Sequence, residues 1–130
     1  MFAIIIACHG HLAYELMQSS FIIFGEQEMV YALDYVADET PTDLEEKFTA
    51  VLDQLPSKTE VLILTDLYGG QPFMTARKFV LQNSKRYHLL AGVNLAMLLE
   101  SYGNRQEVEV DYLEEIGREG VEAYRGEEDV

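Results

Sequence analysis

A histidine and an aspartate each stand directly after an apolar segment of this chain. His9 follows the apolar run 2–8, and Asp66 follows a second apolar run at 61–65. A carboxylate that accepts a hydrogen bond from one imidazole nitrogen fixes the tautomer and leaves the other nitrogen as a nucleophile. The same carboxylate offsets positive charge that builds on the ring during phosphorylation. If the two side chains meet, they predict a phosphohistidine site with His9 as acceptor.

The loop after Asp66 suits a phosphoryl group. Gly69 and Gly70 let the backbone come close to a ligand and offer amide donors. Pro72 is typical of a first helical turn, and the positive end of that helix would point at the same place. The chain has no conventional phosphate loop, which argues against a nucleoside triphosphatase. The predicted phosphate-binding residues are Gly10, Tyr68, Gly69, Gly70 and Gln71, although Tyr68 could cover the site or only pack.

Four other polar side chains are candidates with weaker support. We expect His11 to line the site rather than to act as a second acceptor, and His88 to be structural. Asn94 could face the site or cap a helix, and the sequence does not separate these two roles. Cys8 is most simply a small core residue.

The apolar pattern alternates between strand and helix along the chain. Apolar runs predict strands at 2–8, 29–35, 61–65 and 87–91. Helical spacing predicts helices at 13–24, 44–55, 72–83 and 95–102. Beyond residue 104, the spacing of Val108 to Ile116 suggests a helix interrupted by Gly117 and Gly120, and residues 121–124 could form a short strand.

This order predicts an α/β, doubly wound, mainly parallel four-stranded sheet flanked by helices. For a sheet of this size the common strand order begins 2-1-3-4, and ligands bind where the winding direction reverses. That point lies between the first and third strands. The topology therefore predicts that His9 and Asp66 lie side by side.

Composition narrows the class of protein. The chain has 130 residues, 48% of them hydrophobic, which predicts one compact domain over residues 1–130. The net charge of −14 argues against binding nucleic acid or an anionic membrane. One cysteine and three histidines give no zinc spacing, so no metal is expected. The apolar start lacks a basic leader and a cleavage site, and we expect a cytoplasmic protein.

The acidic residues are unevenly distributed. Residues 26–60 and 100–130 carry 10 and 11 of the 23 acids, and the remaining two are Glu15 and Asp66. The segment 61–99 is nearly free of acids and holds four basic residues. This pattern reflects either chance and solvated acidic faces, or two segments that meet at a site for an anion.

At these residues the sequence resembles the IIA domain of mannose-type permeases (the mannose, fructose and sorbose family) of the phosphoenolpyruvate-dependent sugar phosphotransferase system. The resemblance covers nearly the whole chain. It is carried by AIIIACHGHLA at 3–13, GEQE at 25–28, LILTDLYGGQPFMTA at 62–76, AGVNLAMLLE at 91–100 and GREGV at 117–121.

The resemblance implies a phosphotransferase with a phosphohistidine intermediate and no cofactor. It implies that His9 takes the phosphoryl group from phospho-HPr and passes it to a separate IIB component, and so indirectly serves the membrane subunits IIC and IID. The family's aspartate falls on Asp66. The resemblance also implies a homodimer that exchanges a C-terminal strand, for which residues 121–124 are the candidate.

Three positions depart from the usual pattern of these relatives. Gln71 replaces a common serine, Met74 an asparagine, and Ala96 a proline. If the serine hydroxyl contacts the phosphate, Gln71 must do so differently, or backbone amides suffice. These changes bear on subtype and sugar specificity more than on the reaction.

Three other functions remain as alternatives. One is a regulatory domain that only binds partners, and another is a phosphotransfer subunit of the dihydroxyacetone-kinase type. The weaker alternative is a receiver domain phosphorylated on Asp66. A receiver needs an acidic pair after its first strand, and this chain has Cys8-His9-Gly10 there.

Overall fold

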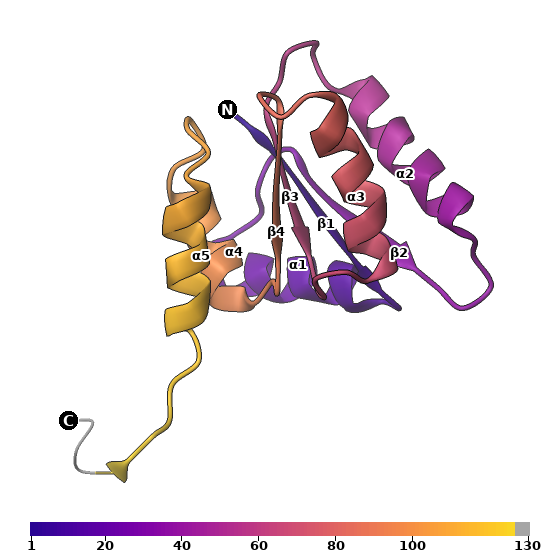
Figure 1. Cartoon of the computed structure of the whole chain (residues 1–130). Helices are drawn as coiled ribbons and strands as arrows, with labels where there is room; N and C mark the ends of the chain where they lie inside the picture. Colours follow the sequence, from indigo (N-terminus) through magenta and orange to yellow (C-terminus); the bar gives the residue numbers. More distant parts are fainter. Residues whose placement is uncertain (127–130) are drawn as a thin grey trace.

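The computed structural model describes residues 1–126, and it shows a parallel sheet between two layers of helices (Figure 1). The strands are β1 (Ala3–His9), β2 (Val30–Tyr35), β3 (Val61–Thr65) and β4 (Tyr87–Ala91). The helices are α1 (Leu12–Phe24), α2 (Pro41–Gln54), α3 (Gln71–Gln82), α4 (Leu95–Gly103) and α5 (Val110–Glu119). The strand order is β2-β1-β3-β4 and all pairs are parallel, which confirms the predicted fold class and order.

The central strands are apolar because both of their faces are covered. On one face, Ile4, Ile6 and Cys8 of β1 pack with residues of α1, α4 and α5. On the other face, Ala3, Ile5 and Ala7 pack with residues of α2 and α3. Burial on two sides therefore fixes β1 and β3 rigidly, and the loops at their carboxyl ends begin from fixed points.

The C-terminal region differs from its prediction in two respects. Gly117 lies inside α5 rather than interrupting it. A glycine is needed there for space, because a Cβ would come within 2.6 Å of the Met97 Cε. Residues 121–124 form no strand in the described part of the chain. They run away from the body of the molecule (Figure 1), and Val121 and Tyr124 are 82% and 81% exposed.

Candidate functional site

His9 is the last residue of the central strand β1, and its side chain is 45% exposed. The next residue, Gly10, takes a left-handed backbone conformation with φ of 61°, which a glycine adopts without strain. The Gly10 amide donates to the carbonyl oxygen of Tyr35 at 2.8 Å. The turn after β1 is thus tied to β2, and the imidazole stands at the carboxyl edge of the sheet.

Asp66 follows β3 immediately and lies beside His9, as the predicted topology requires. Its Oδ2 accepts hydrogen bonds from the backbone amide and from Nδ1 of His9, both at 3.0 Å. The Asp66 side chain is only 15% exposed. An ionised carboxylate only accepts hydrogen bonds, so Nδ1 carries a proton, and in the neutral ring the lone pair is then on Nε2.

The His9 ring lies against the backbone of Gly70. A Cβ at this position would be 2.8 Å from Cε1 and 3.5 Å from Nε2 of His9. The φ of Gly70 is −71°, so the position requires a glycine for space and not for backbone freedom. The sequence pattern indicated a glycine pair near the site, but the contact with the ring required coordinates.

The Gly70 amide is not free for a ligand, in contrast to our expectation. It donates to the carbonyl oxygen of Leu67 at 3.0 Å. Gly70 is the N-cap of α3, and Pro72 has no N–H, so the amides of Gln71 and Phe73 are the first-turn donors that have no acceptor inside the helix. The predicted anion-binding end of α3 therefore consists of these two amides.

The side chains of Gln71 and Tyr68 lie away from the imidazole. The Gln71 Nε2 donates to the Thr75 Oγ1 at 3.4 Å, one turn along α3. The Tyr68 ring packs on Phe73 with centroids 4.3 Å apart and is 79% exposed. The contacts given for these two side chains are thus with α3 residues, and their predicted phosphate contacts stay predictions.

The structure decides between the two roles left open for Asn94. Its Oδ1 accepts from the Met97 amide at 2.9 Å, which caps α4, and its Nδ2 donates to the Gly117 carbonyl at 2.7 Å. Asn94 therefore joins α4 to α5.

His88 lies near the amino end of β4, at the edge of the sheet opposite to His9. Its Nε2 lies 2.9 Å from a carboxylate oxygen of Glu60.

A second histidine–aspartate pair was missed by sequence reasoning. The His11 Nδ1 lies 3.0 Å from the Asp34 Oδ2, and the Tyr14 amide donates to the Asp34 Oδ1 at 3.2 Å. The available signal was the predicted sheet order, which pairs Asp34 in β2 with Cys8 at the end of β1. The order alone does not show to which face the Asp34 side chain points.

Cys8 is fully buried between these two carboxylates. Burial, together with the negative charges of Asp66 and Asp34, raises the pKa of its thiol to about 12. The thiolate is therefore disfavoured at neutral pH, so Cys8 is a poor nucleophile.

The described residues include no group of three or more side chains that could together bind a metal ion. None of the described helices has the length and apolar composition of a membrane-spanning segment.

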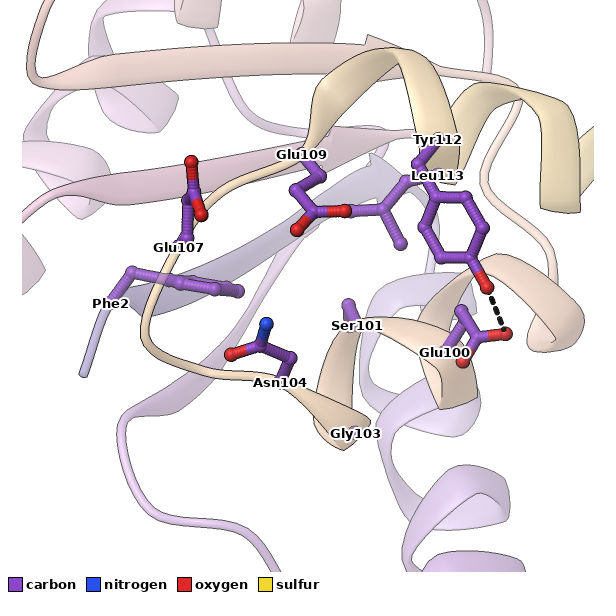
Figure 2. A pocket seen from close by; sticks show the side chains of 9 residues that line it. All are labelled: Phe2, Glu100, Ser101, Gly103, Asn104, Glu107, Glu109, Tyr112 and Leu113. Atoms are coloured by element: carbon purple, nitrogen blue, oxygen red, sulfur yellow. Dashed lines mark hydrogen bonds between the residues drawn. The ribbon is translucent and has the colours of Figure 1, made fainter.

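A hollow of about 360 Å³ lies at the opposite edge of the sheet (Figure 2). Phe2 lies at its rim, and Glu100, Glu107 and Glu109 contribute carboxylates. The Tyr112 hydroxyl donates to Glu100 at 3.1 Å. Three carboxylates make this hollow unsuitable for a phosphate group.

Comparison with known proteins gives consistent matches. The family model described as "PTS system fructose IIA component" matches residues 3–116. The chain is 38% identical over 128 residues to the mannose-specific EIIAB component of Escherichia coli K12, and this match covers 95% of the chain and 39% of that relative. It is 37% identical over 106 residues to the fructose-specific EIIA component of Bacillus subtilis, covering 82% of the chain and 72% of the relative. The chain thus spans about two fifths of the E. coli relative.

Solved structures show the same architecture. The mannose/sorbose-specific IIA subunit of Enterococcus faecalis matches with a TM-score of 0.85 at 27% identity, covering 95% of each chain. The EIIA component of Streptococcus agalactiae matches with a TM-score of 0.82 at 30% identity, covering 95% of this chain and 97% of that one.

Proposed function

The chain belongs to the EIIA-man family of sugar phosphotransferase-system components, and from this premise we propose that it is a phosphohistidine carrier with His9 as the acceptor. The observation that carries the proposal is the bond between the His9 Nδ1 and the Asp66 carboxylate, which leaves Nε2 as the nucleophile. We propose that residues 1–130 form one IIA domain of this kind.

In the proposed reaction, the His9 Nε2 attacks the phosphorus of a phosphohistidine on the donor, phospho-HPr. The donor's N–P bond breaks and its electron pair returns to the donor ring, while the new N–P bond forms on His9. The Asp66 carboxylate offsets the positive charge that develops on the His9 ring. The reverse steps pass the phosphoryl group to a IIB component, and neither direction needs a metal or a nucleotide.

The amides of Gln71 and Phe73 would hold the phosphoryl oxygens. They form the amino end of a 12-residue helix, where partial positive charge accumulates. Gly70 brings that helix end close to the His9 ring, because its missing Cβ allows an approach that any other residue would prevent. This arrangement gives a physical reason for the glycine pair that precedes Pro72.

The test is phosphorylation by phosphoenolpyruvate, enzyme I and HPr, followed by location of the label. We expect acid-labile, alkali-stable label on His9 that disappears in His9→Ala, whereas His88→Ala, the matched control, keeps it. Asp66→Asn should slow transfer and leave the fold intact. Label that is lost in alkali would indicate an acyl phosphate on Asp66, as in a receiver domain, and would refute the proposal.

We further propose that the protein is a homodimer in which residues 121–124 pair with the partner's sheet. β4 pairs with β3 alone among the described strands, so its other edge is open to a further strand. The exposed Val121 and Tyr124 would gain burial there. Sedimentation should show a dimer for the full chain and a monomer after truncation at Gly120, and a full chain that stays monomeric at micromolar concentration would contradict this assembly.

A further inference from the structure

The loop that carries His9 carries a second histidine in the same arrangement. The His11 Nδ1 lies 3.0 Å from the Asp34 Oδ2, and the His9 Nδ1 lies 3.0 Å from the Asp66 Oδ2. The two carboxylates come from the strands on either side of β1. In both pairs the bond is made through Nδ1, which leaves Nε2 for other partners, and the His11 side chain is 77% exposed.

Positive charge is scarce at this edge of the sheet. The loops after the four strands (10–11, 36–40, 66–70 and 92–94) contain no lysine or arginine, and they hold three acids, Asp38, Glu39 and Asp66. Lys47 of α2 approaches the edge, but its ammonium group lies 2.7 Å from a Glu39 oxygen and donates to the Asp34 carbonyl. A phosphoryl group carries up to about two negative charges, which these loops leave without a compensating cation.

We propose that protonated His11, held by Asp34, supplies the positive charge that offsets the phosphoryl group at His9. This inference rests on the proposed function. Two peptide units separate the residues, so their Cα atoms are at most about 7.6 Å apart. The two rings turn toward carboxylates on opposite sides of β1, so the charge of His11 acts on the phosphoryl group across the turn and not by direct contact. His11 acts through its charge and takes no covalent part in the transfer.

The proposal predicts a pH dependence with a definite sign. The charged groups around His11 are Asp34 from β2, Glu15 in the first turn of α1, the Lys47–Glu39 pair beside Asp34, and the His9–Asp66 pair. Histidine is the side chain that changes charge between pH 5 and 8. The contribution of His11 is therefore present at low pH and is lost as the pH rises and the ring loses its proton.

The experiment compares transfer from phospho-HPr to wild type, His11→Gln and His11→Lys between pH 6 and 8.5. Each variant's kcat/KM is divided by the wild-type value at the same pH, so that pH effects on the donor, which both proteins share, cancel. We expect His11→Gln to be slower than wild type at pH 6, because a unit positive charge beside the phosphoryl group is removed, and to approach wild type at pH 8.5. Since lysine keeps its charge, His11→Lys should match wild type at pH 6 and exceed it at pH 8.5.

The matched control is His88→Gln, which removes a histidine that is also paired with a carboxylate but lies elsewhere on the sheet. Its ratio to wild type should stay at one. A His11→Gln ratio that is the same at every pH would overturn the inference, and so would label that remains on His11 in the His9→Ala variant, because His11 would then be a second acceptor. Wild-type protein that takes no label on His9 would refute the proposed function itself. The labelling experiment reveals that outcome before any ratio of kcat/KM values is measured.

Discussion

Gly70→Ala offers the most direct test of how the backbone positions His9, the proposed acceptor. The added methyl group would stand 2.8 Å from the His9 Cε1 and 3.2 Å from the Leu67 carbonyl oxygen. Carbon atoms in contact prefer a separation of about 3.5–4.0 Å, so the ring must move by about 1 Å. The His9–Asp66 bond at 3.0 Å does not survive a shift of that size.

The expected result is a large loss of transfer with a small loss of stability. A displacement of about 1 Å at a reacting group lowers a rate by up to about 100-fold, and we expect a 10- to 100-fold fall in kcat/KM. The φ of −71° suits alanine, so the fold is kept. Alanine is a poorer N-cap than glycine by about 0.5–1 kcal/mol, which lowers the Tm by only about 2–5 °C.

The assay is single-turnover transfer from phospho-HPr, with the His9 ring followed by nitrogen NMR. Gly103→Ala is the control, because a Cβ there meets its nearest neighbour, the Glu100 Oε2, at an ordinary 3.8 Å. It should transfer at the wild-type rate. If Gly70→Ala also transferred at that rate with the His9–Asp66 bond intact, then contact with the Gly70 backbone would not position the acceptor.

Three further changes test the structure around the site. Thr65→Val should leave stability unchanged or raise the free energy of unfolding by up to about 1 kcal/mol in urea denaturation, because the buried Thr65 hydroxyl has no hydrogen-bond partner among the described residues. Gly117→Ala should lower it by about 1–3 kcal/mol, since a Cβ would come within 2.6 Å of the Met97 Cε, and an unchanged urea midpoint would contradict the close packing of α4 on α5. Native Cys8, whose pKa is raised to about 12 by burial and by the nearby carboxylates, should resist a thiol reagent at pH 8 and react once unfolded.

The sheet was predictable from the sequence because its two central strands are apolar on both faces and its two edge strands are apolar in most positions. The predicted ranges 61–65 and 87–91 agree with β3 and β4, since an apolar run bounded by polar loops marks the ends of a buried strand. The predicted proximity of His9 and Asp66 is confirmed for the same reason: strand order alone decides which loops meet.

Contacts that depend on where a side chain points were not predictable. Asp34 lies in a half-buried edge strand, and the sequence gives no sign that its carboxylate reaches both His11 and the Tyr14 amide. Gly117 was expected to interrupt a helix because glycine disfavours helical backbone, yet it lies within α5, where close packing on α4 excludes a side chain. For Asp34, tertiary contacts decide where the side chain points. For Gly117, they outweigh the low helix preference of glycine.

The central place of β1 in the sheet brings two carboxylates to its carboxyl end. A strand with neighbours on both sides can receive a carboxylate from each, and the loop after β1 takes Asp34 from β2 and Asp66 from β3. Each carboxylate binds a backbone amide as well as an imidazole, so it fixes both the loop and the ring. An edge strand such as β4 has a neighbour on one side only, so only one such carboxylate could reach its loop. The strand order therefore determines both the position of His9, the proposed acceptor, and the number of carboxylates that reach the turn beside it.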